Sequence, residues 1–231
     1  MRKFITSALV AAGLAATAAT GAHASSGGGH LDIKTPDWSW QGIFGHFKED
    51  QLQRGFKVYQ KVCATCHNLK HLYYRNLEQI GLPESRVEEI APGKPREHFQ
   101  AGMAKSTAMA TFNTVPPDLT LMAEARPGGP DYLYKFLLSF ERREGHTKLY
   151  NKAFGNFVSM PRPTWAAASY ANEPVEGTKE QKAEDVTAFL RWASEPNLEA
   201  RHELGIKVIL FLIVLSALFY ALKRRIWADV H

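Results

Sequence analysis

The stretch that decides how this chain is interpreted is Cys63-Ala64-Thr65-Cys66-His67. Two thiols three residues apart, followed at once by an imidazole, form the C-x-x-C-H signature for attachment of a c-type haem. On one helical turn, residues i and i+3 lie on the same face, so both sulfurs can reach the two vinyl groups of one porphyrin. The stretch therefore predicts one haem c, attached covalently through Cys63 and Cys66, with His67 as an axial ligand of the iron.

Two other uses of a cysteine pair at this spacing compete with haem attachment. A redox dithiol is typical of a helix that starts directly after a strand, whereas the residues before Cys63 have a helical pattern. A zinc site needs two further ligands, yet Cys63 and Cys66 are the only cysteines in the chain. Haem attachment is therefore the favoured interpretation.

Length, composition and charge limit the number of domains and the kind of partner. A chain of 231 residues, 45% of them hydrophobic, suits one domain of ordinary size with appendages. The formal net charge is +5, but the basic residues stand mostly beside acidic ones and form no stripe. We therefore expect no nucleic-acid partner.

Residues 1–24 have the three parts of a secretory signal peptide. Arg2-Lys3 gives a basic start, an apolar run follows from Phe4 to about Ala19, and Ala22-His23-Ala24 has the form of a cleavage site. A second membrane anchor is the alternative, but the run is rich in alanine and threonine and only weakly apolar. We expect this segment to be removed after export, which agrees with haem attachment in an oxidising compartment.

A helix is predicted to lead directly into the haem motif. Asp50, followed three residues later by Gln53, has the form of a capping box. The apolar face that follows has helical spacing and consists of Leu52, Phe56, Tyr59 and Cys63. An aromatic-rich segment precedes this helix, and we expect all of its rings to pack in the core: Trp38, Trp40, Phe44 and Phe47.

Further helices are predicted downstream from apolar faces and from start signals. The side chains that suggest helix up to Gly81 are Leu72, Tyr73, Leu77 and Ile80, and residues 85–90 suggest another short helix. The predicted capping residues are Asp131, for a helix ending near Gly145, then Thr178 with Gln181, and Asn197 for the last helix.

Two proline-containing loops lie between these predicted helices. Val115-Pro116-Pro117-Asp118-Leu119 cannot be helical, because consecutive prolines remove donors and hold the backbone extended. Pro161 and Pro163 likewise hold Met160 on a stiff segment, where its thioether can serve as sixth ligand of the iron. Core packing is the usual role of methionine. From the residues alone, other sixth ligands stay open: Met103, Met109, Met122 and the remaining histidines, His98 among them.

The run Leu204–Leu222 is predicted to be a transmembrane helix. It has 19 residues and one charge, Lys207 near its start, and it can span a hydrocarbon layer of about 30 Å. A buried core helix is the alternative, but the run is apolar all round. Lys223-Arg224-Arg225 follows at once, so the positive-inside rule places residues 223–231 in the cytoplasm. Residues 25–203 then form an external haem domain.

Read together, these stretches resemble the cytochrome c1 family in a bacterial form, the haem-bearing subunit of the cytochrome bc1 complex. The resemblance covers almost all of the chain after residue 24, in the expected order. The matching stretches are Arg54 to His67, Tyr74-Arg75, Pro116 to Leu119, Ala125-Arg126, Gly128-Gly129, Asp131-Tyr132, Met160-Pro161, Ala188 to Ala193, Glu195-Pro196 and an anchor ending in Lys223-Arg224.

The resemblance implies a mostly α fold: a cytochrome c-like helical haem domain with long loops, plus one C-terminal transmembrane helix. It makes Met160 the expected sixth ligand, Arg126 the expected partner of a haem propionate, and Pro117 part of a segment against the haem. An arginine fork suits such a carboxylate. No catalytic residue is implied on this chain, because quinol oxidation and proton release occur on other subunits of the complex.

Electron relay is the function that the resemblance implies. A Rieske iron–sulfur protein would reduce this chain, which would reduce a soluble or tethered cytochrome c. Cytochrome b and the bilayer of the bacterial inner membrane are further expected partners, with one membrane pass and the haem domain in the periplasm. The alternatives are a free-standing, membrane-anchored c-type cytochrome and a haem ligand sensor or peroxidase-like protein. The last two would need an open sixth position.

Overall fold

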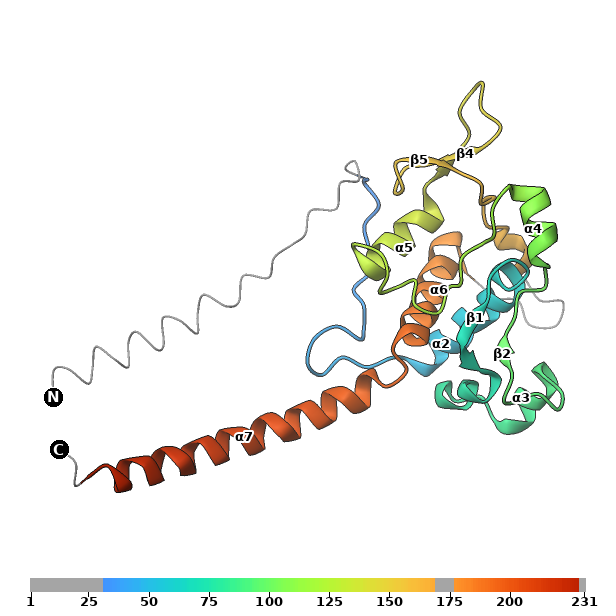
Figure 1. The fold of residues 1–231 in the computed structure, drawn as a ribbon. Helices are drawn as coiled ribbons and strands as arrows, with labels where there is room; N and C mark the ends of the chain where they lie inside the picture. Colours follow the sequence, from blue (N-terminus) through green and yellow to red (C-terminus); the bar gives the residue numbers. More distant parts are fainter. Residues whose placement is uncertain (1–30, 169–176, 229–231) are drawn as a thin grey trace.

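The computed structural model describes residues 31–168 and 177–228, so the predicted signal peptide lies outside the described residues. Helices dominate and two small sheets join them, which confirms the mostly α class (Figure 1). In chain order, with η marking short 3₁₀ or π segments, the elements are α2 (Glu49–Val58), η2 (Tyr59–Cys63), β1 (Leu69–Tyr73), η3 (Tyr74–Ile80), α3 (Glu84–Ile90), β2 (His98–Phe99), α4 (Lys105–Phe112), α5 (Gly129–Leu138), β3 (Phe140–Glu141), β4 (Leu149–Asn151), β5 (Asn156–Val158), η4 (Trp165–Ala168), α6 (Lys179–Ser194) and α7 (Leu198–Ile226).

The helices α2 and α6 form the centre of the domain and approach most closely at Gly55. A Cβ at this position would overlap the backbone carbonyl of Asp185 and press on the side chain of Phe189. Beside the crossing, Arg54 donates from Nε and Nη2 to the two carboxylate oxygens of Asp185, at 3.0 and 3.2 Å. Asp185 is fully buried, so this forked pair satisfies its charge and fixes α6 against the helix that leads into the cysteine motif.

Gly55→Ala is expected to destabilise the domain. The added methyl group would have to displace the backbone of Asp185 rather than a flexible side chain, and overpacking of this kind costs about 1–3 kcal/mol or more. Denaturant unfolding of the purified chain in detergent, followed by near-UV circular dichroism, measures the free energy of unfolding. Gly205→Ala is the matched control, because a Cβ there meets nothing within 4 Å. Equal stability of the two variants would contradict the close crossing.

The aromatic segment before α2 packs as predicted except at one ring. Trp38 and Trp40 stack with their ring centroids 4.7 Å apart, and Phe47 lies against Trp40. All three rings are buried, and Trp38 Nε1 donates to Asp131 Oδ1 at 2.6 Å. Phe44 is not a core residue: it is 85% exposed at the tip of a loop. The prediction for Phe44 is wrong because the turn that carries it projects away from the core.

The capping box predicted at the start of α2 is absent. Asp50 is already the second residue of the helix, and its carboxylate pairs with Arg54, one turn further on, at 2.8 Å. The Gln53 side chain does not reach back to the helix start, because its Nε2 donates to Ile80 O at 2.9 Å. The side chains of Asp50 and Gln53 therefore bind Arg54 and Ile80 instead of the free backbone N–H groups at the start of the helix.

The remaining caps give a mixed result. Asp131 lies within the first turn of α5 rather than before it, and its carboxylate accepts from the Trp38 indole instead of capping. Asn197 precedes α7 as predicted, but its side chain makes no capping bond. Thr178 is confirmed as the cap of α6, since its Oγ1 accepts from Gln181 N at 3.2 Å.

The segment after the cysteine motif is partly strand, where the sequence predicts helix. Leu69–Tyr73 forms β1, which pairs antiparallel with β2, and only Tyr74–Ile80 is helical. The strand is favoured because the backbone N–H of Lys70 donates to the side chain of Asp118 at 2.8 Å instead of to a helical carbonyl. Gly81 ends η3 in the left-handed conformation, as predicted, and α3 confirms the next short helix.

A three-stranded antiparallel sheet of β3, β4 and β5 forms where the sequence predicts no strand. Because Phe140 leaves the helix to pair with Asn151, α5 ends at Leu138 rather than near Gly145. The Asn151 side chain is fully buried and hydrogen-bonded to the end of α5. This sheet fixes the start of the loop that carries Met160.

The helix α7 leaves the domain as one long rod and contains the predicted span at residues 204–222 (Figure 1). Its most apolar 18-residue window has a mean hydropathy of 2.4 and is covered by no other part of the protein. Among the described residues, α7 alone is long and apolar enough to cross a membrane. Lys207 pairs with Glu203 at 2.5 Å, on the side of the apolar run that faces the domain.

Candidate functional site

The cysteine motif begins at Cys63, the last residue of η2, the π-helical segment that continues α2. Ala64 N donates to the carbonyl of Tyr59, five residues earlier, at 2.8 Å. Cys66 N and His67 N then both donate to Cys63 O, at 3.0 and 2.9 Å. Single π turns inside helices are frequent at functional sites. Here the main-chain bonds hold Cys63, Cys66 and His67 in one turn at the end of a packed helix, the position that the sequence predicts for the motif.

The imidazole of His67 is buried and held in one orientation. It is 8% exposed, and its Nδ1 lies 2.7 Å from the carbonyl oxygen of Pro117. Because a carbonyl oxygen can only accept, Nδ1 carries the proton and the lone pair is left on Nε2. Burial lowers the pKa of His67, and the bond to Pro117 opposes this only in part. The favoured species is therefore a neutral imidazole with Nε2 available, the form that binds a metal ion.

The paired-proline segment is fastened to the strand that follows His67. Leu119 N donates to Asn68 O at 2.9 Å, and the Asp118 side chain accepts from the backbone of β1 at 2.8 Å. These bonds hold the Pro117 carbonyl in place. The predicted non-helical course of this segment is confirmed, and it orients the imidazole through a main-chain oxygen.

A buried tyrosine fixes the same histidine from the helix side. Tyr59 is 1% exposed, and its hydroxyl donates to His67 O at 2.9 Å. Its ring packs against Phe99 and Phe189, so it ties η2 to β2 and α6. In the sequence Tyr59 is one member of an apolar face, with no role for its hydroxyl. The available signal was a tyrosine at a core position of the helix that leads into the motif.

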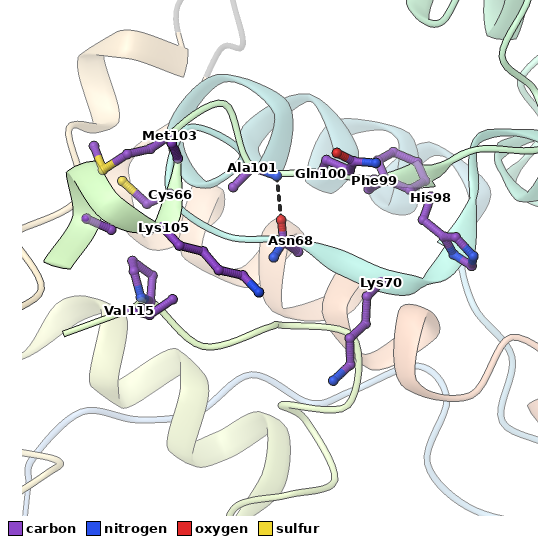
Figure 2. A pocket seen from close by; sticks show the side chains of 13 residues that line it. Cys66, Asn68, Lys70, His98, Phe99, Gln100, Ala101, Met103, Lys105 and Val115 are labelled. Carbon is purple, nitrogen blue, oxygen red and sulfur yellow. Dashed lines mark hydrogen bonds between the residues drawn. The ribbon is translucent and has the colours of Figure 1, made fainter.

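The loop directly before α4 holds the backbone between the two cysteines. Gly102 N and Met103 N donate to the carbonyls of Ala64 and Thr65, at 3.0 and 2.8 Å. The Asn68 side chain accepts a further bond from the same loop (Figure 2). No sequence motif marks this loop, because its contribution comes from the main chain.

A cleft of about 430 Å³ opens beside this loop, with Cys66 and Met103 at one end of it (Figure 2). Lys105 and Asn68 line its middle, and His98 lies toward the other end. The cleft shows that one side of the Cys66 turn is open rather than filled by core side chains.

The two thiols are not joined in a disulfide, and each cysteine is half-buried. Burial of the Cys63 thiol, reinforced by the neighbouring Cys66, raises the pKa of Cys63 to about 12. Within residues 31–168 and 177–228, no three metal-binding side chains gather into a cluster. The pair also lies at the end of a helix, not at the start of one. The zinc and redox-dithiol interpretations therefore gain no support.

Met160 lies half-buried in the bend that follows β5. Residues 161–164 continue without helix, and the side chain of Arg162 fixes their course by donating to Phe140 O at 2.9 Å. The next element, η4, packs against η2. The segment that follows the Met160 loop therefore lies against the element that ends at Cys63.

The other methionines have different surroundings. Met109 is 49% exposed on α4, and Met122 packs against the hydrophobic core. Met103 lines the cleft beside Cys66. Met103, which lies beside Cys66, and Met160, whose loop leads into η4, are therefore the two methionines to be compared as sixth ligands.

Arg126 is exposed in the turn before α5, and its Nη1 donates to Ala125 O at 3.0 Å. Among the described residues its guanidinium has no carboxylate partner. Burial raises the pKa of Tyr132, and the Arg126 charge opposes that rise. An arginine fork without an acid partner among the described residues is suited to an external carboxylate. The phenol of Tyr132 is its polar neighbour, and the sequence predicts no role for that phenol.

Comparison with known proteins identifies the family of this chain. The family model described as the Cytochrome C1 family matches residues 38–94 and 91–230. The chain belongs to the cytochrome c1 family. Cytochrome c1 of Rhodospirillum rubrum is 38% identical over an alignment of 272 residues that covers 100% of this chain and 99% of that protein. Cytochrome c1 of Cereibacter sphaeroides is 33% identical, with 91% of each protein covered. A cytochrome b/c1 of Bradyrhizobium diazoefficiens is 34% identical over 84% of this chain and 35% of that longer protein.

Membership of the cytochrome c1 family gives the site its cofactor and the chain its general role. Cytochrome c1 proteins carry one covalently attached c-type haem and serve as the electron-transfer haem subunit of the cytochrome bc1 complex. The donor set fits such a haem, since two thiols on one turn stand next to an imidazole whose Nε2 is left available by its bond to Pro117. The bacterial relatives and α7 agree with a cytochrome c1 anchored by a single membrane pass.

Proposed function

We propose that this cytochrome c1 accepts single electrons from a Rieske iron–sulfur protein and passes them to a soluble or tethered cytochrome c. The haem, when bound, supplies the one-electron redox couple. The observation that carries the proposal is the bond between His67 Nδ1 and the Pro117 carbonyl at 2.7 Å, beside two thiols on one turn. It supports a relay because a ring held by the main chain keeps its Nε2 in one place through both redox states.

Each site residue has a defined part in this relay. Cys63 and Cys66 hold the porphyrin through thioether bonds, which requires both sulfurs on one side of the turn. His67 Nε2 and Met160 Sδ would be the two protein ligands of the haem iron, which would then have no position left for an exogenous ligand. Arg126 binds a propionate carboxylate with its fork. None of these residues has to gain or lose a proton during electron transfer.

We infer the membrane topology from the predicted signal peptide and from the apolar run with its basic flank. Residues 1–24 are removed after export, residues 25–203 form the periplasmic haem domain, residues 204–222 cross the inner membrane, and residues 223–231 form a cytoplasmic tail. The basic residues in the last turn of α7 support this orientation. A single span in the bilayer places the chain where it can contact cytochrome b, and the name of the cytochrome b/c1 relative supports that partnership.

Purification of the native complex tests the relay. With an affinity tag after His231, we expect cytochrome b and an iron–sulfur protein to co-purify from detergent-solubilised membranes. Added quinol should then reduce the c-type haem, and removal of the iron–sulfur protein should stop this reduction without changing the haem spectrum.

Two other results would contradict the proposal. Recovery of the chain alone, with a haem that quinol does not reduce, would indicate a free-standing anchored cytochrome. Binding of carbon monoxide by the reduced native protein would indicate an open sixth position, as in a ligand sensor or peroxidase-like protein.

A further inference from the structure

A short loop before α2 ends in two exposed apolar side chains. Gly45 N donates to Gly42 O at 3.2 Å, so Ile43 and Phe44 are the central residues of a tight turn. Ile43 is 67% exposed and Phe44 is 85% exposed. A single exposed hydrophobic residue is ordinary on a protein surface, but two adjacent ones at the apex of a closed turn form a projecting apolar tip.

The base of this loop is held firmly. His46 N donates to Ser39 O at 3.1 Å, and Ser39 Oγ donates to His46 O at 2.8 Å. A Cβ on Gly45 would overlap the backbone carbonyl of Trp40, so the chain packs too closely there for any other residue. The rings of Trp40 and Phe47 are buried against each other below the turn. The loop therefore presents its tip in a fixed position and cannot fold the two side chains into the core.

The same loop is fastened to the start of the membrane anchor. Phe47 N donates to Glu199 Oε1 at 2.7 Å, in the first turn of α7. The apolar run of α7 begins at Leu204, about 7.5 Å further along the axis at 1.5 Å per residue. Phe44 is three residues from Phe47, a stretch that reaches about 10 Å when extended. The tip can therefore reach the level at which α7 becomes apolar, and Figure 1 shows the loop projecting on the side of the domain from which α7 leaves.

We propose that Ile43 and Phe44 insert into the interfacial layer of the bilayer, as a second membrane contact beside α7. Lipid is the favoured occupant because the loop is hydrogen-bonded to the start of α7, the inferred membrane anchor, and because apolar and aromatic side chains are favourable at the membrane interface. A single helix leaves the domain free to rotate and tilt on its anchor. A second contact point fixed through Phe47 and Glu199 limits both motions. The proposal rests on α7 as an anchor and not on the electron route.

The test places a fluorescent probe at the tip of the full-length holoprotein in vesicles of phosphatidylcholine and phosphatidylglycerol. Phe44→Cys, or Ile43→Cys as a second position, is labelled with the environment-sensitive dye nitrobenzoxadiazole, and the unmodified chain gives the background labelling. Phe154→Cys is the matched control. Phe154 is also an exposed aromatic residue in a turn, at 53%, but it lies between β4 and β5, well away from the start of α7 (Figure 1).

Insertion predicts that lipids with a quencher on the acyl chain reduce the emission at position 44 or 43 several-fold more than at position 154. A water-soluble quencher should show the opposite order. Equal access of both quenchers to the tip and to the control would overturn the proposal. Shielding of the tip only in the assembled complex, and not in vesicles, would also overturn it, because a partner subunit would then be the occupant. An unchanged haem spectrum in each variant shows that the labelled protein is folded.

Discussion

A chain with both Cys63 and Cys66 replaced by serine is expected to contain no covalently bound haem. A serine hydroxyl is far less nucleophilic than a thiol and forms no thioether, while its size leaves the turn intact. The Cys63 carbonyl that accepts from Cys66 N and His67 N is a main-chain group, so these bonds survive the substitution. A denaturing gel stained for haem, normalised to the amount of protein, measures the loss. Each single variant should retain reduced staining through its remaining sulfur.

Thr65→Ser is the matched control for this experiment. Thr65 lies between the two cysteines and is exposed, and the bond that its carbonyl accepts from Met103 N does not involve the side chain. This variant should keep full haem staining. Full staining of the double cysteine variant would refute the assignment of the attachment site, whatever the state of the membrane anchor or the partners.

The parts of the fold that follow from the sequence are those set by local chemistry. Covalent attachment requires a fixed spacing, so Cys63 and Cys66 can be recognised from the sequence without any knowledge of the fold. The membrane helix is equally clear, because an uninterrupted apolar run needs no partner in the protein. The paired prolines before Asp118 exclude a helix by their own geometry.

The parts that do not follow depend on residues far apart in the chain. Asp131 looks like a helix cap, but the Trp38 indole, 93 residues earlier, takes its carboxylate. The strands β1 to β5 are two to five residues long, and such short segments have no period of their own. Phe44 is apolar and aromatic, which predicts burial, yet it lies in a projecting turn and its side chain is exposed.

The candidate site shows the same division. The histidine is identified by its place in the motif, but the group that orients its ring is a carbonyl 50 residues further on. A main-chain oxygen has no sequence signature, so Pro117 can be linked to the site only through the family resemblance or the structure. The hydroxyl of Tyr59 and the main-chain donors of the loop before α4 are hidden for the same reason.

Replacing Met160 by leucine is expected to lower the reduction potential and to open the iron to carbon monoxide. A thioether is a soft donor that favours the reduced iron, and His/Met ligation raises the potential. Axial ligands change haem potentials over about 0.8 V. A decrease of about 0.2 V in a one-electron couple corresponds to roughly 4.6 kcal/mol, enough to make electron transfer from an iron–sulfur partner strongly uphill. A potentiometric titration and a carbon monoxide difference spectrum measure the two effects.

Met103→Leu is the decisive comparison, because Met103 lines the cleft beside Cys66 and its loop is bonded to the cysteine turn. Its backbone N–H, which holds the Thr65 carbonyl, is retained in the variant, so only the sulfur is lost. The loop of Met160 is stiffened by Pro161 and by the bond from Arg162 to the Phe140 carbonyl in β3, so its sulfur can keep one position through redox cycles. Met103→Leu should therefore leave the potential and the carbon monoxide response unchanged. The reverse pattern, with an effect at Met103 and none at Met160, would move the sixth ligand to the cleft beside Cys66 while leaving the covalent attachment untouched.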